Sequence, residues 1–233
     1  MQKNSDLDKS LIDSLIEQIL STSATRPTYF VQIGAGAGDR DPRSFRDGFS
    51  EFIKRAPLND SSRILLVEPN PLNQKKLKEC WQDFSNAEIF QLGIVPKAFS
   101  KRTLRFYFTG LDGPHYQVAS FNRFHVLKHF PNLKESDLQT INVGTIDLKT
   151  FIEQETKGEK IVLLALDIEG IDAEVLLDTD FDSLNVQLLS FEHLHLGGKK
   201  TDVIKHLEEC GFEYVGSGVD HNDYDLLFQR IPT

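Results

Sequence analysis

The chain has 233 residues, and its 26 basic and 35 acidic side chains give a formal net charge of −9 at pH 7. Hydrophobic residues make up 39% of the chain, which excludes a disordered protein, and no apolar run approaches the roughly 20 residues of a membrane-spanning helix. The acidic balance and the lack of a basic cluster argue against nucleic-acid and membrane partners.

The start of the chain is polar and unlike a secretory signal, and Cys80 and Cys210 match no metal-binding spacing. We therefore expect a cytoplasmic protein with reduced thiols. The length predicts a single domain over residues 1–233, in which residues 1–26 contain a leading helix.

The hydrophobic pattern predicts helices that alternate with short buried strands. Asn70 followed by Pro71 marks a helix start, Thr201 is a candidate helix cap, and Gly211 is a candidate left-handed helix end. In chain order, the predicted elements are a helix at 6–20, a strand at 29–33, a helix at 44–56, a strand at 64–67, a helix at 70–81, strands at 88–92 and 103–108, an irregular segment at 109–139, a strand at 140–143, a helix at 145–155, a strand at 161–166, a short helix at 170–177, a strand at 187–191, a helix at 201–211, and strands at 212–215 and 225–228.

This alternation predicts an α/β fold of the Rossmann-like, three-layer sandwich type. Near-continuous apolar strands indicate a mostly parallel sheet that is covered on both faces. We expect seven strands, of which the last runs antiparallel. Such sheets bind ligands beyond the carboxyl ends of their strands, so the residues that follow each strand are the candidates for function.

Three alternating glycines, Gly34, Gly36 and Gly38, follow the first predicted strand and precede Asp39. Glycines at this place let the backbone turn tightly and approach a ligand closely. The spacing departs from the dinucleotide-binding fingerprint, which would need a further glycine at position 39. The alternative is a plain strand-to-helix turn, although three glycines exceed what a turn needs.

Glu68 ends the second predicted strand, where a carboxylate can accept both hydroxyls of a ribose. An exposed acid at a strand end is the alternative, and the nearby glycine loop favours the ribose hypothesis. Gly93 follows the third strand and could present a backbone N–H to an adenine. Asp167 and Glu169 follow the most apolar strand, so they are candidates for ligand orientation or acid–base work; the alternative is that they cap the helix at 170–177.

Glu192, His193 and His195 follow the next strand. If the strand continues, the two histidines share a face, and His193 could act as a base. Solvated loop histidines are the alternative. A metal held by Asp167, Glu192 and a histidine lacks a helix-spaced or Cys-x-x-Cys ligand motif, so we expect no metal.

The segment at 109–139 is long and irregular, and such a segment inside a compact domain is typical of a cover over a bound substrate. His115 and Ser120 are its candidate substrate contacts. Its aromatic residues could equally serve ordinary packing.

Taken together, five short motifs resemble the FkbM-like methyltransferases, which are S-adenosylmethionine-dependent enzymes with the class I Rossmann-like fold. The resemblance covers roughly residues 28 to 195. The motifs that carry it lie at residues 34–39, 68–71, 145–148, 167–170 and 174–176.

The resemblance implies that the glycine loop passes under the methionine and ribose parts of the cofactor, and that Glu68 holds the ribose hydroxyls. It implies further that Gly93 borders the adenine and that Asp167 lies near the sulfonium and the acceptor. The sequence departs from the family at Gln32, where an acid is common, and at Ala165, where a lysine is common. The cofactor-binding residues expected from the resemblance are Gln32, Gly34, Gly36, Gly38, Asp39, Glu68, Pro69, Asn70, Gly93 and Asp167.

The resemblance implies methyl transfer, in which the acceptor must be aligned within roughly 3–3.5 Å of the methyl group and water excluded. We expect O-methylation of a hydroxyl or a carboxylate on a small-molecule or natural-product acceptor, such as a sugar, polyketide or peptide. A hydroxyl would need Asp167 or His193 as the base, whereas a carboxylate would need cationic or N–H donors. The expected substrate contacts are His115, Ser120, Glu169 and His195.

Two alternatives stay open. A nucleotide-dependent oxidoreductase could use the same fold, and a methyltransferase-like domain without catalysis could act as a binding module. A neighbouring domain or a homodimer is a possible partner.

Overall fold

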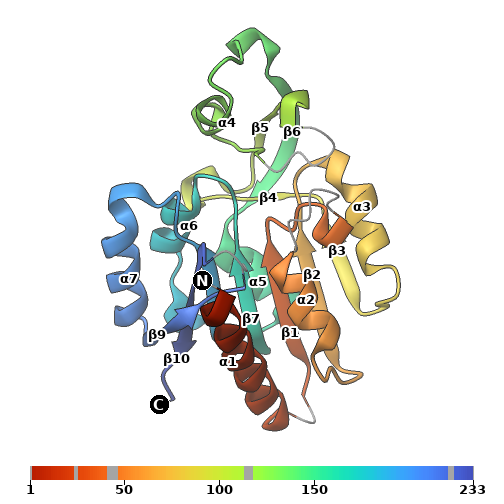
Figure 1. Cartoon of the computed structure of the whole chain (residues 1–233), viewed down its shortest axis with the longest axis vertical. Helices are drawn as coiled ribbons and strands as arrows, with labels where there is room; N and C mark the ends of the chain where they lie inside the picture. The colour runs from red at the N-terminus through yellow and green to blue at the C-terminus, as the bar shows by residue number, and fades with distance from the viewer. Residues whose placement is uncertain (1, 24–25, 41–46, 113–117, 220–222, 233) are drawn as a thin grey trace.

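A computed structural model describes residues 2–23, 26–40, 47–112, 118–219 and 223–232 of the chain. Seven strands form one sheet in the order β3-β2-β1-β7-β8-β10-β9, in which β10 runs antiparallel to both β8 and β9. The other pairings in this sheet are parallel, so the predicted α/β fold, with a mostly parallel seven-stranded sheet and an antiparallel last strand, is confirmed (Figure 1). The strands are β1 (Thr28–Ile33), β2 (Ser62–Val67), β3 (Ala87–Phe90), β7 (Lys160–Leu166), β8 (Val186–Glu192), β9 (Phe212–Ser217) and β10 (Asp225–Arg230).

Helices cover both faces of this sheet because alternate strand residues are apolar on both sides. Along β1, Phe30 packs in one buried cluster, while Val31 and Ile33 pack in another. The Phe30 cluster includes side chains of α1 (Gln2–Ser21), α2 (Gly48–Arg55) and α3 (Pro71–Trp81). The opposite cluster includes side chains of α5 (Leu148–Thr156), α6 (Asp172–Asp178) and α7 (Lys200–Glu209).

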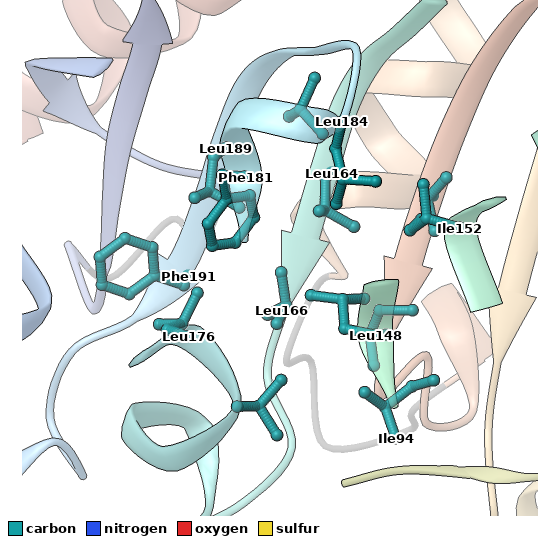
Figure 2. Packing of buried hydrophobic residues seen from close by; sticks show 14 of the residues in the cluster. Ile94, Leu148, Ile152, Leu164, Leu166, Leu176, Phe181, Leu184, Leu189 and Phe191 are labelled. Carbon is teal, nitrogen blue, oxygen red and sulfur yellow. The ribbon is translucent and has the colours of Figure 1, made fainter. Parts of the chain in front are cut away.

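The second cluster shows why the chain folds as three layers. Leu164 and Leu166 of β7 project to the same face as Leu189 and Phe191 of β8. Figure 2 shows these four side chains meeting residues of α5 and α6. All four are at most 1% exposed, and burial of a side chain of this size contributes about 1.5–3 kcal/mol.

A smaller three-stranded unit stands at the end of the large sheet and contains the segment predicted as irregular. It consists of β4 (Gly93–Ile94), β5 (Thr103–Phe108) and β6 (Gln139–Ile146), in the order β4-β6-β5. Within residues 109–139 the chain also forms α4 (Arg123–His129) and two short 3-10 helices at Gly110–Asp112 and Glu135–Asp137. The prediction of an irregular segment is therefore wrong in part. Figure 1 shows α4, β5 and β6 together, beyond the end of the large sheet.

Several helix boundaries differ from those predicted. The strand β6 continues to Ile146, so α5 begins at Leu148 and is capped by Asp147 rather than starting at residue 145. Thr201 is not a cap, because a 3-10 turn at Gly197–Lys199 runs directly into α7. By contrast, Asn70 caps α3 as predicted. Residues 44–46 of the helix predicted at 44–56 lie outside the described residues. In the described part of the chain, no helix is both long and apolar enough to cross a membrane.

Candidate functional site

A cleft of about 330 Å³ opens at the carboxyl ends of the central strands. Its walls come from the ends of β1, β2, β7 and β8, the segment before β10, and three apolar residues of the inserted segment. These three are Val118, Ala119 and Phe121. The cleft therefore lies where a parallel sheet of this type binds its ligand.

The glycine loop forms the floor of the cleft and is held close to two neighbouring strands. The N–H groups of Gly34 and Ala35 both donate to the carbonyl of Val67, over 2.9 and 3.0 Å. Gly34 has φ +85°, and a Cβ atom there would lie 1.7 Å from the carbonyl oxygen of Asp167. Only glycine fits at this position, because the backbone is left-handed and a neighbouring strand end passes directly beside it.

The end of the loop lines the cleft and also packs against α3. Gly38 has φ +62° and packs against Cys80, whose Sγ would be 2.6 Å from an added Cβ. Asp39 does not line the cleft; its carboxylate pairs with Lys54 over 2.7 Å. The expectation that Asp39 contacts the cofactor is therefore not supported, because its side chain joins the loop to α2.

Glu68 is buried at the cleft wall with 5% of its surface exposed. Its Oε2 accepts the N–H of Gly36 over 2.7 Å, and its Oε1 accepts the N–H of Asn70 over 2.7 Å. Burial raises the pKa of Glu68 to about 7, although these hydrogen bonds act in the opposite direction. Pro69 lines the cleft beside Glu68, whereas Asn70 lies behind it and caps α3.

Gln32 places an unsatisfied acceptor at the cleft. Its Nε2 donates to Asp47 over 2.9 Å, while its buried Oε1 has no hydrogen-bond partner among the described residues. Asp47 also caps α2 by accepting from the N–H of Ser50, and burial raises the pKa of its carboxyl group. Asp47 lines the cleft as well, a contact that sequence reasoning missed because residue 47 fell inside the helix predicted at 44–56, whereas α2 begins at Gly48.

Gly93 lies beneath an aromatic ring from the inserted segment. A Cβ at Gly93 would be 2.2 Å from Cζ of Phe121, which packs edge-on against Phe106 with ring centroids 4.9 Å apart. Both Gly93 and Phe121 line the cleft. The absence of a side chain at Gly93 is therefore what lets the inserted segment close down on this part of the cleft.

We expect Gly93→Ala to displace the Phe121 ring and to lower the free energy of unfolding by about 1–3 kcal/mol, as overpacking does elsewhere. Urea denaturation measures this loss. In a Phe121→Ala background the same substitution should cost less than about 0.5 kcal/mol, because the clashing ring is gone. An equal loss in the free energy of unfolding in both backgrounds would contradict the close contact between Gly93 and the Phe121 ring.

Four carboxylates line the opposite side of the cleft: Asp167, Glu169, Glu192 and Asp225, here called the acidic wall. Asp167 faces the open cleft, yet the surrounding protein atoms remove much of its hydration, and the other three and Asp172 repel its charge. Both effects raise the pKa of Asp167 well above its ordinary value of 3.8.

The loop after β7 is shaped by Asp172 rather than by the two predicted acids. The Asp172 carboxylate accepts the N–H groups of Ile168 and Gly170 over 2.9 and 3.1 Å. The alternative that Asp167 and Glu169 cap the following helix is therefore wrong, and both residues line the cleft. Glu169 has φ +55°, a strained conformation for a residue with a side chain.

Of the predicted substrate contacts that the structure describes, only Glu169 lines the cleft. Ser120 is fully buried; its hydroxyl donates to the carbonyl of Glu169 over 2.6 Å and accepts the N–H of Asn122 over 3.0 Å. Its role as a substrate contact is not supported, because the hydroxyl hydrogen bonds the inserted segment to Glu169 and the hydroxyl oxygen is used by the neighbouring backbone at Asn122. His115 lies outside the described residues.

The two histidines after β8 do not share a strand face, because β8 ends at Glu192. His195 turns back, so that its Nδ1 lies 2.8 Å from Oε2 of Glu192. His193 lies outside the cleft lining, with its Nδ1 3.3 Å from Nζ of Lys200. The structure thus brings Asp167 to the cleft but not His193, the other candidate base.

Comparisons with known proteins give one family match and several remote structural similarities. The family model of the methyltransferase FkbM domain matches residues 32–214, and comparison with curated proteins gives no match. Among solved structures, Aeropyrum pernix fibrillarin with natively bound S-adenosyl-L-methionine is 12% identical, with 94% of this chain and 73% of that chain covered and a TM-score of 0.43. A Streptococcus thermophilus rRNA methylase is 8% identical, with coverages of 97% and 95% and a TM-score of 0.43. The Methanococcus jannaschii fibrillarin pre-rRNA processing protein is 11% identical, with a TM-score of 0.40; 88% of this chain is covered but only 66% of that chain, just under two thirds.

The family match covers well over half of the chain, from the end of β1 into β9. It includes the glycine loop, Glu68, Gly93 and three members of the acidic wall, Asp167, Glu169 and Glu192. The predicted resemblance is confirmed, and the chain belongs to the FkbM methyltransferase family.

Proposed function

We propose that this protein transfers the methyl group of S-adenosylmethionine to a hydroxyl oxygen of a small-molecule or natural-product acceptor, such as a sugar, polyketide or peptide. One observation carries the choice of acceptor. Among the described residues, every ionisable side chain that lines the cleft is acidic except Tyr224, and no lysine, arginine or histidine lines it. A carboxylate acceptor would meet repulsion without a cationic partner, and a nucleic-acid backbone would meet the same repulsion.

S-adenosylmethionine is the cofactor expected for the family, and the residues of the cleft fit it. Gln32 offers a buried, unsatisfied acceptor, Oε1, for a cationic amino group. Glu68 offers a buried carboxylate for the ribose hydroxyls, and the glycine loop lets the backbone approach closely. Gly93 and Phe121 both line the cleft and offer an apolar surface against which the adenine could pack. When bound, the cofactor supplies a methyl group already activated by a positively charged sulfur.

The acidic wall would favour that positive charge and would also serve the acceptor. Asp167 is the base we propose: its carboxylate receives the proton of the acceptor hydroxyl as the oxygen becomes nucleophilic. A carboxyl group with a raised pKa is a stronger base than an ordinary aspartate, which suits this task. The inserted segment, through Val118, Ala119 and Phe121, would exclude water from the cleft.

Asp167→Asn is expected to slow methyl transfer by about 10² or more, because the amide cannot accept the proton. Turnover of a labelled methyl group measures this loss, and calorimetry checks that cofactor binding persists. His193→Gln is the matched control and should change turnover by less than about threefold, since His193 lies outside the cleft lining. A large loss with His193→Gln and none with Asp167→Asn would remove Asp167 from this role.

The acceptor class is tested by incubating the protein with methyl-labelled S-adenosylmethionine and a metabolite extract, followed by mass spectrometry of the labelled products. The proposal predicts label on an ether oxygen. Label on carbon, nitrogen or an ester, or on RNA, would contradict O-methylation of a hydroxyl. Cofactor binding without any labelled product from a range of extracts would support the alternative of a binding module without catalysis.

A further inference from the structure

Three histidines gather beside the acidic wall in a cluster that the methyl-transfer site does not use. They are His125, His129 and His195, here called the histidine cluster. Their ring centroids lie 4.8 Å (His125–His129), 4.6 Å (His125–His195) and 5.3 Å (His129–His195) apart. One ring nitrogen of each lies within 4.8 Å of those of the other two. Three imidazoles that face one another at this range form a potential metal-binding set.

The cluster joins distant parts of the chain. His125 and His129 are four residues apart on α4, so they lie on the same face of the helix, and His195 comes from the turn after β8. This helix-spaced pair is not evident from the sequence as long as residues 109–139 are interpreted as irregular. The premise for expecting no metal is therefore wrong.

Two carboxylates flank the cluster in positions typical of metal sites. Oε2 of Glu169 lies 2.7 Å from Nε2 of His125, and Oε2 of Glu192 lies 2.8 Å from Nδ1 of His195. The second contact orients the His195 ring and directs its Nε2 away from Glu192, as the partners of metal-bound histidines do. Glu169 is close enough to His125 to share an ion with it.

The electrostatic setting favours a cation. Glu169 and Glu192 belong to the acidic wall, whose four carboxylates all line the cleft. His125 is buried and His195 is half-buried beside these carboxylates. Lys128 is the nearby cation that opposes binding, and it is exposed to solvent.

We propose that His125, His129 and His195, with Glu169 as a fourth donor, bind a divalent transition metal ion, with Zn²⁺ as the preferred ion. Three nitrogen donors and one carboxylate suit Zn²⁺ and not Mg²⁺ or Ca²⁺, which prefer oxygen. A tetrahedral site with Zn–N bonds of about 2.0–2.1 Å needs its donors about 3.4 Å apart. His129 is exposed, so a change of its side-chain rotamer can bring its nitrogen nearer to the other two.

Binding of the ion would hold α4 to the loops after β7 and β8. Glu169 and Glu192 line the cleft as well as flank the cluster, so the ion would link the inserted segment to the cleft wall. A ligand that binds only the folded state raises its stability. We therefore expect Zn²⁺ to raise the melting temperature of the protein.

The test uses the untagged full chain, stripped with a chelator and titrated with ZnCl₂ in a calorimeter and with CoCl₂ by visible absorption. We expect one ion per chain and Co²⁺ bands typical of nitrogen ligands in a tetrahedral site. His129→Gln and His195→Gln should each weaken Zn²⁺ binding by at least about 10²-fold and abolish the zinc-dependent rise in melting temperature. His206→Gln is the matched control, since this half-buried histidine lies on α7 and contacts the carbonyl of Thr179.

Binding that survives both cluster substitutions, or no binding by the wild-type chain, would overturn the proposal and leave the cluster as a set of structural hydrogen bonds. Circular dichroism of each variant shows whether a loss of binding comes from misfolding, and His129→Gln is at an exposed position where the fold should persist. The titration contains neither cofactor nor acceptor, so its outcome does not depend on the proposed methyl transfer.

Discussion

Glu68→Ala is expected to weaken the binding of S-adenosylmethionine by about 3 kcal/mol, or roughly 10²-fold. The substitution removes the carboxylate proposed to accept the ribose hydroxyls, and it also leaves the N–H groups of Gly36 and Asn70 without their acceptor. Calorimetric titration measures the loss. Glu88→Ala is the matched control, because Glu88 is an exposed residue on the neighbouring strand β3 and should leave the affinity unchanged. Equal affinities for the wild-type and Glu68→Ala proteins would remove the ribose assignment.

The same carboxyl group should make stability depend on pH. Burial raises the pKa of Glu68 from its ordinary value of 4.5 to about 7. Between these values the folded protein holds a proton that the unfolded chain has lost, so the free energy of unfolding falls as pH rises from 4.5 to 7. The contribution of this one group is about 3 kcal/mol. Denaturation across this pH range should show a smaller decline in Glu68→Gln, which cannot ionise, than in the wild-type protein.

Binding of the cofactor should lower the raised pKa of Glu68 again. Hydrogen bonds donated by ribose hydroxyls favour the ionised carboxylate, so binding near pH 6.5 should release protons. Calorimetry in buffers of different ionisation enthalpy detects that release. An identical proton count for the wild-type and Glu68→Gln proteins would show that the protons come from another group.

Gly34→Ala is expected to destabilise the fold by more than about 4 kcal/mol, or to prevent folding. The added Cβ would lie 1.7 Å from the carbonyl oxygen of Asp167, and neither strand end can move without breaking the sheet. Gly36→Ala is the matched comparison: Gly36 also has a left-handed φ of +54°, yet an added Cβ would meet nothing within 4 Å. It should cost only about 1–2 kcal/mol.

Urea denaturation of the two variants separates backbone strain from the close approach of β1 and β7. A similar loss in both would mean that the left-handed conformation, and not the contact with Asp167, makes Gly34 necessary. Because Gly34 and Asp167 are both at the cleft, the contact also fixes the distance between the glycine loop and the proposed base.

Much of the fold could be predicted because the signal in β7 and its neighbours is local. A run of six apolar residues at Ile161–Leu166 can only be satisfied by burial on both faces, and that requires a parallel sheet between helices. The glycine loop and Glu68 were recognisable for a similar reason, since each directly follows such a strand. Residues that directly follow a buried strand are thus the part of a site that can be predicted most readily from the sequence.

The inserted segment could not be predicted because its contacts are with residues far along the chain. Phe121 is placed by the lack of a side chain at Gly93, and Ser120 by the carbonyl of Glu169. Seven residues of α4 are too few for a periodic pattern, although Asn122 as a cap and the spacing of His125 and His129 were available signals.

The prediction that the two histidines after β8 share a strand face is wrong for a different reason. The face on which His193 and His195 lie depends on where the strand ends, and β8 stops at Glu192, one residue before the first of them. Beyond the end of the strand its alternation of faces no longer applies, and the chain turns so that His195 contacts Glu192. The predicted cofactor contact of Asp39 also depended on local chain direction. The 3-10 turn at Gly38–Arg40 directs its carboxylate to Lys54 and not to the cleft.

Calorimetric titration of the full chain with S-adenosylmethionine, S-adenosylhomocysteine and NAD measures most directly what the cleft binds. We predict that the first two bind with one molecule per chain, that each competes with the other, and that NAD gives no heat of binding. Tight binding of NAD, with no binding of either sulfur compound, would contradict the assignment of the cleft and of its glycine loop.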